Sequence, residues 1–214
     1  MKQKRIKWLI NAILVLLSCI WLAPVFFVLL NTLKGKQEYN LGSLWELPKG
    51  CELADNIRYL MMNKVVFQGM ASSFLYAILG AAFALLMATL AAYAISHLKI
   101  RRKMFWFLFI YSGTIFPFQI YLIPIYKAYS KIGLYNTRLG MILFYSAICI
   151  PFCMFVLRNF FLGIDKEICE SAHMDGATKM QILTRIFVPM AKAPLAILFM
   201  SQFNWCWNDL MFGL

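Results

Sequence analysis

Few side chains in this 214-residue sequence are of the types that carry out acid–base, nucleophilic or metal chemistry. The chain holds 9 Asp and Glu, 2 His and 6 Cys, whereas 62% of its residues are hydrophobic. Asp209 is the one charged residue near the centre or end of a long apolar run. A membrane-embedded enzyme needs several ionisable groups that converge on one place. The sequence therefore predicts a protein that is not an enzyme and has no metal site of its own.

The cysteines and histidines give no stronger signal for chemistry. Cys149 and Cys153 are four residues apart, so one helix face carries both, but no His or further Cys accompanies them. Cysteine in an apolar run behaves as a small hydrophobic residue, and we expect a structural role for this pair. His97 and His173 fall in predicted loops, where we expect solvated surface positions.

The longest patterned polar stretch covers residues 163–190. Asp165 can begin a helix there, and Asp175-Gly176 can end it, because glycine tolerates the left-handed conformation at a helix stop. Thr178 and Gln181 have the spacing of a capping box that begins a second helix. The stretch is too polar to cross a membrane, and we expect a short helix–glycine–helix hairpin.

The second helix of this hairpin has an apolar pattern. Met180, Leu183 and Phe187 recur at a spacing that places them on one helix face, and we expect Pro189 to end the helix. Such a face docks in a groove on another protein or packs on the spans of its own chain.

The elements that must position this hairpin are long charge-free runs. A helix of about 20 apolar residues crosses the hydrocarbon core of a bilayer. The sequence predicts an all-α fold, a polytopic transmembrane helical bundle forming a single domain over residues 1–214. Its five expected spans cover about residues 8–31, 67–96, 104–126, 139–158 and 191–213, and Pro117 and Pro124 can kink the third.

The chain has a net charge of +12, and the placement of its basic residues predicts the topology of these spans. Lys and Arg concentrate in cytoplasmic loops of membrane proteins, where they face anionic lipid, so we do not expect nucleic acid as a partner. Residues 2–7 and 97–103 each carry four basic residues, which indicates a cytoplasmic N-terminus. Segments 34–64 and 127–138 are then outside and segment 158–192 is inside, with 13 basic residues inside and 8 outside.

The hairpin resembles the EAA loop of permease subunits of binding-protein-dependent ATP-binding-cassette (ABC) importers. The family pattern is Glu-Ala-Ala, three residues, Gly, nine residues, then Ile-x-Leu-Pro. Here it reads Glu170-Ser171-Ala172, Gly176 and Ile186-x-Val188-Pro189, and Asp175-Gly176-Ala177 is similar to the sugar-importer variant. Residues 131–137, 151–152, 157–161 and 207–209 also look like maltose-type carbohydrate permeases. The resemblance covers about residues 70–214, and residues 1–69 share only the layout.

The resemblance implies a type I importer permease that forms half of a translocation pore in the cell membrane. Its implied partners are a second permease, in this branch usually a different chain, a cytoplasmic ATPase dimer and an extracytoplasmic solute-binding protein. The chain itself would bind no cofactor, because ATP and Mg²⁺ belong to the ATPase. The implied ATPase-coupling residues are Glu170, Ser171, Ala172, Asp175, Gly176, Ile186 and Pro189.

Family members of this type typically have six spans, whereas this sequence stops at Leu214, in or just after the fifth. We therefore expect either a fragment or a chain that lost its last span, and a pore wall that five spans leave incomplete.

Polar residues inside the spans are the candidates for lining a pore or contacting substrate, since polar groups in lipid usually face a cavity or a partner helix. Amides and aromatic rings suit a sugar, and the same residues also suit contacts between helices. The candidates are Gln119, Gln202, Asn204, Trp205, Asn208 and Asp209.

Other transport functions remain open at this point. A related importer for another solute, such as glycerol phosphate, is one alternative, and an ion-coupled secondary transporter is another. The latter favours charged residues within the spans, which are nearly absent here.

Overall fold

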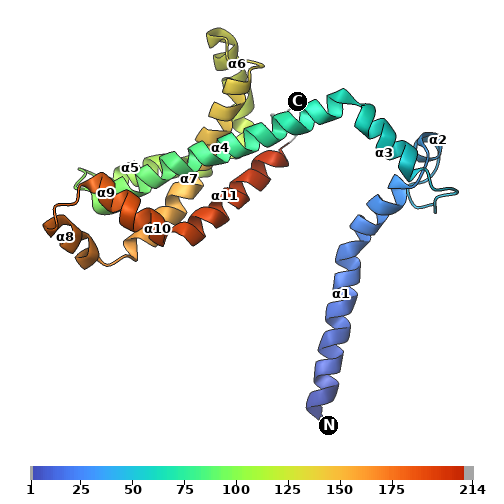
Figure 1. Cartoon of the computed structure of the whole chain (residues 1–214), viewed down its shortest axis with the longest axis horizontal. Helices are drawn as coiled ribbons and strands as arrows, with labels where there is room; N and C mark the ends of the chain where they lie inside the picture. The colour runs from blue at the N-terminus through green and yellow to red at the C-terminus, as the bar shows by residue number, and fades with distance from the viewer. Residues whose placement is uncertain (1, 210–214) are drawn as a thin grey trace. The chain divides into compact units, whose positions relative to one another are not determined.

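The computed structural model describes residues 2–209, which form helices and no strands (Figure 1). These residues group into two compact units, with the boundary between Gln68 and Gly69. How the two units fit into the single domain expected over residues 1–214 stays a prediction.

The first unit consists of a long apolar helix and a polar cap. Helix α1 (Lys2–Thr32) is followed by the short helices α2 (Lys36–Leu41) and α3 (Leu53–Met62). The ammonium group of Lys34, which is only 2% exposed, donates to the carbonyls of Ser43 at 3.0 Å and Leu44 at 3.3 Å. The Asn56 amide donates to the carbonyls of Thr32 and Lys34, each at 2.9 Å. These bonds fasten residues 34–56 to the end of α1.

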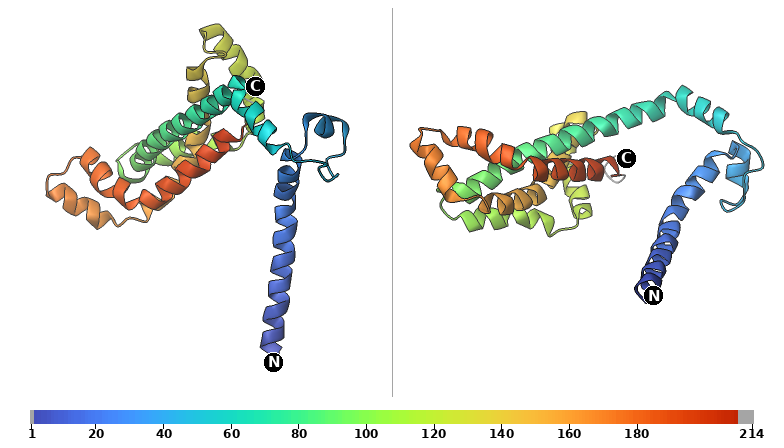
Figure 2. Two further views of the ribbon diagram at one scale, coloured as in Figure 1. Left: turned by 45° about the vertical axis from the view of Figure 1, so that its right-hand side comes forward. Right: turned by 60° about the horizontal axis from the view of Figure 1, so that its bottom comes forward.

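The second unit is built on a stripe of small residues along α4 (Lys64–His97). Helices α7 (Arg138–Leu162) and α11 (Lys192–Trp207) belong to this unit and contact each other (Figure 2). A Cβ atom added to Gly80 would lie 2.9 Å from the Cβ of Tyr145 on α7 and 3.9 Å from the sulfur of Cys206 on α11. Small side chains allow such close approach, and packing of this kind holds helices together where lipid provides no hydrophobic driving force. The stripe consists of Ala77, Gly80, Ala81, Ala84, Ala88 and Ala92, all buried.

Two groups of buried side chains divide this unit along its length. One group, which we call the hairpin-side core, unites the carboxyl-terminal halves of α4 and α7 with residues 182–187. The other, the cavity-side core, joins the opposite halves of α4 and α7 to the end of α11. The hairpin-side core includes Tyr93, Phe107, Leu157, Phe161, Leu183 and Phe187, and the cavity-side core consists of Ala77, Ala84, Phe144, Tyr145, Cys149 and Cys206.

The third expected span, residues 104–126, is broken rather than kinked. Helix α5 (Lys103–Tyr111) continues into a 3-10 turn, η1 (Ser112–Thr114). The chain resumes at η2 (Phe118–Tyr121) and α6 (Leu122–Ile132), and the two halves meet at 90°. The break lies at Pro117, because a proline disfavours helical geometry in the residue before it and has no N–H to donate.

The lengths of the helices agree with a membrane protein. Helices α1, α4 and α7 coincide with the expected spans 8–31, 67–96 and 139–158, and each is long and apolar enough to cross a bilayer. The number rises to five if each of two bent helix pairs counts as one span. Helix α11 covers part of the expected span 191–213, of which residues 210–213 lie outside the described residues.

Replacement of Gly80 by alanine tests the close packing of α4. A new Cβ atom against the Tyr145 Cβ forces the helices apart, and overpacking of this kind costs about 1–3 kcal/mol. We expect Gly80→Ala to lower the midpoint of thermal unfolding of the detergent-solubilised protein.

Gly69→Ala is the matched control, because Gly69 lies on the same helix with nothing within 4 Å of an added Cβ. The control should be neutral or stabilising by about 1 kcal/mol, the usual gain from glycine to alanine within a helix. Equal shifts in the two variants would contradict the close approach.

Candidate functional site

The turn of the predicted hairpin is built by backbone geometry. Helix α8 (Lys166–Met174) is followed by its C-cap residue, Asp175, and then by Gly176, whose φ of +80° is in the left-handed region. The Gly176 N–H donates to the His173 carbonyl at 3.1 Å, and the Ala177 N–H donates to the Ala172 carbonyl at 3.0 Å. This pair of bonds is a Schellman motif, which closes the end of a helix without any side chain. The predicted stop at Gly176 is confirmed.

The second half of the hairpin begins with the predicted capping box. Helix α9 (Lys179–Ile182) follows Thr178, whose hydroxyl accepts from the Gln181 N–H at 3.3 Å. The Gln181 side chain accepts from the Thr178 N–H at 2.8 Å. Only Gly176 and Ala177 lie between Asp175, the C-cap residue of α8, and Thr178, the N-cap residue of α9. Hydrogen bonds therefore close the chain on both sides of the turn. The hairpin lies at one end of the second unit (Figures 1 and 2).

The expected coupling residues separate into two groups on this hairpin. Glu170, Ser171, Asp175, Gly176 and Pro189 are exposed. Ala172 and Ile186 are half-buried and pack against the hairpin-side core. One group is therefore open to a partner, and the other attaches the hairpin to the helices behind it.

The second helix of the hairpin differs from the predicted apolar face. A π-helical turn, η3 (Leu183–Phe187), follows α9, and its extra residue per turn changes which side chains point inward. Leu183 and Phe187 are buried as expected, but Met180 is 59% exposed and Ile182 is buried instead.

The ends of the hairpin also depart from two expectations. Asp165 is the N-cap residue of α8, but its side chain makes no capping hydrogen bond. Pro189 does not end the helix, which continues as α10 (Val188–Met190) before a bend of 77° leads into α11.

His97 joins the end of α4 to this hairpin. Its ring stacks on Tyr93 at 6.0 Å and meets the edge of Phe187 at 4.5 Å. His97 is therefore half-buried at the end of a helix rather than solvated in a loop, whereas His173 is exposed as expected. Tyr93 lies four positions before His97, and this helical spacing is the sequence feature that could have predicted their contact.

A cavity of about 410 Å³ lies near the cavity-side core. Gln202, only 7% exposed, and Trp205 line it from α11, and Cys149 lines it from α7. The break at Pro117 supplies much of the remaining wall. The sequence did not single out the other lining residues, which include Thr114, Phe116, Phe118, Phe152 and Ser201.

The other candidate substrate residues lie apart from this cavity lining. Gln119 is exposed on η2. Asn208 donates to the side-chain oxygen of Asn204 at 2.9 Å, and both residues are exposed. Asp209 accepts from the buried Tyr145 hydroxyl at 2.8 Å, which links α7 to the end of α11. The Tyr145–Asp209 bond fits the alternative of polar groups that hold helices together, whereas the Asn204–Asn208 bond lies within one helix end.

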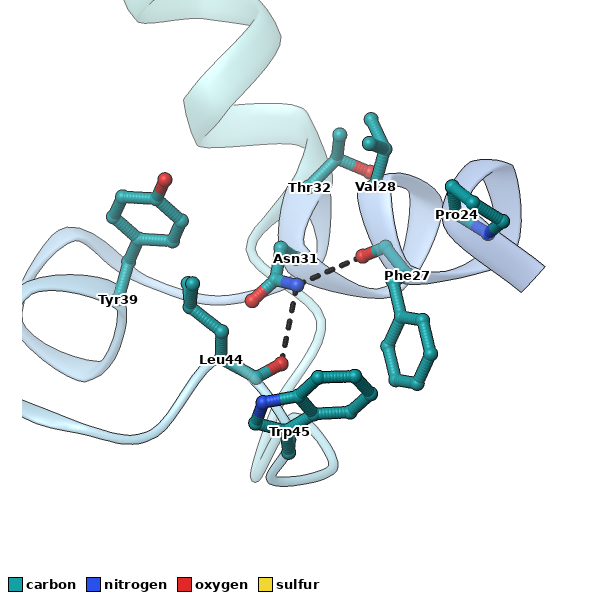
Figure 3. A pocket seen from close by; sticks show the side chains of 8 residues that line it. All are labelled: Pro24, Phe27, Val28, Asn31, Thr32, Tyr39, Leu44 and Trp45. Atoms are coloured by element: carbon teal, nitrogen blue, oxygen red, sulfur yellow. Dashed lines mark hydrogen bonds between the residues drawn. The ribbon is translucent and has the colours of Figure 1, made fainter.

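The first unit has a pocket of its own, of about 540 Å³, at the end of α1 (Figure 3). The Phe27 and Trp45 rings meet edge to face at 4.4 Å. The Asn31 amide donates to the carbonyls of Phe27 and Leu44, and its oxygen is buried without a hydrogen-bond partner among residues 2–209. The pocket lies where the end of the first expected span, residues 8–31, meets segment 34–64, which the topology predicts to be outside.

Metal-ligand side chains are scattered through the described part of the chain. Among residues 2–209 no three His, Cys, Asp or Glu side chains gather closely enough to hold a metal ion. The sulfurs of Cys149 and Cys206 lie 3.9 Å apart, and both cysteines are free.

The helices and the hairpin define a class of protein, a helical membrane protein with a rigid hairpin at one end of its bundle. Residues 84–214 match the family described as binding-protein-dependent transport system inner membrane component. The chain belongs to this family.

Curated relatives and a solved structure agree with this family. The osmoprotective compounds uptake permease protein GgtD of Synechocystis is 34% identical over 59% of this chain and 43% of its own length. The diacetylchitobiose uptake system permease protein NgcG of Streptomyces coelicolor is 26% identical over 98% of this chain and 68% of its own length. The match to GgtD thus spans less than half of that relative.

The fold is that of an ABC importer permease. A chain in the crystal structure of a bacterial ABC transporter involved in the import of the acidic polysaccharide alginate superposes with a TM-score of 0.79 at 24% identity. The superposition covers 98% of this chain and 73% of that one.

The thiol of Cys169 on α8 offers a test of the hairpin's local electrostatics. Burial raises its pKa, and the neighbouring Glu170 carboxylate raises that pKa further. Glu170→Gln removes the second cause, so the pKa falls and the reactive thiolate becomes more abundant at pH 8. We expect alkylation by N-ethylmaleimide to become a few-fold faster, in a background where the exposed Cys19 and Cys51 are serine.

Glu167→Gln is the control, since it makes the same change of charge on the same helix. Equal acceleration by both variants would contradict the specific effect of Glu170.

Proposed function

We propose that this chain is a permease subunit of an ATP-driven ABC importer for a sugar or oligosaccharide. It forms half of a translocation pore with a second permease and spans the cell membrane several times, with a cytoplasmic N-terminus. The observation that carries the proposal is the rigid hairpin at one end of a membrane bundle, within the segment that matches the importer family.

In this proposal the hairpin is the coupling element. Its exposed residues, Glu170, Ser171, Asp175 and Gly176, sit in a cleft of a cytoplasmic ATPase dimer that binds ATP and Mg²⁺. Movement of the ATPase then reaches the membrane through Phe187, which is fully buried.

Phe187 contacts two of the long helices of the second unit, α4 and α7. Its ring lies 5.0 Å from that of Tyr93 on α4 and 5.1 Å from that of Phe161 on α7. A displaced hairpin must therefore carry the carboxyl-terminal halves of α4 and α7 with it, which supports a change of access at the other end of the unit.

Segments 34–64 and 127–138 face the outside in this topology and receive the solute-binding protein. The hydrogen bonds of Lys34 and Asn56 support this role for the first segment, because they give it a fixed shape that a partner can recognise.

Gly176→Asp tests the coupling role. Aspartate tolerates the left-handed conformation better than most residues, so the hairpin should fold, but the added side chain stands where the ATPase must approach. We expect ATP-driven uptake in proteoliposomes that contain the complete importer to fall at least about ten-fold, the loss from about 1.4 kcal/mol.

Gly133→Asp is the matched control, since Gly133 ends α6 with a φ of +73° and open space around it. Because Gly133 lies in a segment proposed to receive the binding protein, the readout for this control is copurification of the ATPase with the tagged permease, which should survive in Gly133→Asp and be lost in Gly176→Asp. If Gly176→Asp retained the ATPase as well as Gly133→Asp, the hairpin would not be the coupling element.

The cavity supports a neutral sugar as the substrate. All of its lining residues are uncharged, so the phosphate of a solute such as glycerol phosphate would find no cation among them. Gln202 offers amide hydrogen bonds and Trp205 an aromatic ring, which suit hydroxyl groups and the apolar face of a sugar. An ion-coupled transporter is less well supported, because the one candidate charge, Asp209, already accepts from Tyr145.

Gln202→Leu tests this use of the cavity. Loss of a hydrogen bond worth about 0.5–1.5 kcal/mol should slow sugar uptake by about two- to ten-fold at saturating loaded binding protein, with ATP hydrolysis retained. Asn204→Leu, on the same helix but outside the cavity lining, should leave uptake unchanged. Equal effects would place the substrate elsewhere.

A further inference from the structure

A cation at the hairpin end of α7 has no anion within the described chain. The guanidinium carbon of Arg158 lies 4.3 Å from the centre of the Phe107 ring on α5. The Nε atom is buried without a hydrogen-bond partner, and the side chain as a whole is half-buried. Among residues 2–209 the guanidinium has the aromatic ring as its only electrostatic contact.

Such an arrangement is costly unless an anion completes it. A partly buried charge without a counter-ion loses hydration, and a cation–π contact restores only part of that loss. The Phe107 ring covers one side of the guanidinium but accepts none of its N–H groups as a conventional acceptor would, so the planar fork of N–H donors remains available to a ligand. That fork fits two oxygen atoms of one phosphate.

Basic residues also precede Phe107 in the chain. Lys103 lies one helical turn before Phe107 on α5, and its ammonium group donates to the Ser96 carbonyl at 3.4 Å. Lys99, Arg101 and Arg102 are exposed in the preceding loop. No residue of 97–103 is acidic, so this end of α5 has a positive potential that no nearby carboxylate in the loop cancels.

The apolar surface of α5 continues directly from this positive region. Its exposed side chains are suited to acyl chains, and tryptophan is enriched where a membrane meets water. The exposed residues of the helix are Met104, Phe105, Trp106, Leu108 and Phe109. A ligand that fits both surfaces has an anionic head and apolar tails.

We propose that Arg158 and the basic loop 97–103 bind the phosphate headgroup of an anionic phospholipid, whose acyl chains lie along α5. The lipid supplies the anion that Arg158 lacks, and its bound headgroup braces the junction between α5 and α7 next to the hairpin. Placement in the cytoplasmic leaflet rests on the topology proposed above, whereas the binding itself does not.

Native mass spectrometry of the full chain in detergent tests the proposal, with phosphatidylglycerol and phosphatidylcholine as the added probes. We expect the chain to retain phosphatidylglycerol in preference to phosphatidylcholine. Arg158→Gln should lower this retention by about five-fold or more, since each basic residue near a membrane surface adds about 1 kcal/mol. Arg158→Lys should fall between, because lysine keeps the charge and loses the fork.

Arg138→Gln is the matched control, as Arg138 begins the same helix at its opposite end and is exposed. It should retain the lipid as the unaltered chain does. Arg102→Gln is a second variant, exposed and therefore safe for folding if Arg158→Gln unfolds the protein, and it should weaken retention by a smaller factor.

Three results would overturn the proposal. The first is equal retention of the two lipids by the unaltered chain. The second is a loss of phosphatidylglycerol retention in the control Arg138→Gln that is as large as the loss in Arg158→Gln. The third is displacement of the lipid by millimolar inorganic phosphate, which would identify a free anion as the ligand. A failure of the importer function leaves this outcome unchanged, because lipid retention needs no ATPase or sugar.

Discussion

Everything in the second unit depends on how closely α4 approaches its neighbours. The alanine and glycine stripe brings the α4 backbone to within a side chain's thickness of α7 and α11, so that an added methyl group at Gly80 has no room. In lipid this close contact replaces the hydrophobic drive that holds soluble helices together. Because the same stripe runs from Ala77 to Ala92, it supports the cavity at one end and the hairpin at the other.

The hairpin achieves rigidity with few residues. A Schellman motif closes α8, a capping box opens α9, and only two residues separate them. In the proposed coupling role a flexible connector would absorb a push from the ATPase, whereas this closed turn would pass it to Phe187 and so to the rings of Tyr93, His97 and Phe161. The proposed coupling therefore depends on these aromatic contacts between the hairpin and two long helices.

Local signals made much of this structure predictable from the sequence. Gly176 and the Thr178–Gln181 pair act within one turn of the chain, and both behaved as their residue types indicate. The charge-free runs likewise predicted the long helices, because the length and hydropathy of a segment depend only on its own residues. Other features were not predictable from such local patterns: the contact of His97 with Phe187 joins residues distant in sequence, the π-helical turn interrupts the regular helical period, and Pro117 indicated a kink but not the size of the bend. Of the polar candidates, only Gln202 and Trp205 reached the cavity.

The break at Pro117 has a consequence for how selectivity can change over time. A helix that stops leaves its last carbonyl groups without partners inside the helix, and irregular backbone at membrane depth is tolerated only beside protein or water. At this break the Phe109 and Tyr111 carbonyls accept from the Ser112 and Thr114 hydroxyls, and the Ser112 carbonyl accepts from the Ile115 N–H, so the chain satisfies these groups itself. If the cavity holds the proposed substrate, selectivity then falls to its few uncharged lining side chains, and these can be exchanged to suit one solute after another without rebuilding the backbone wall.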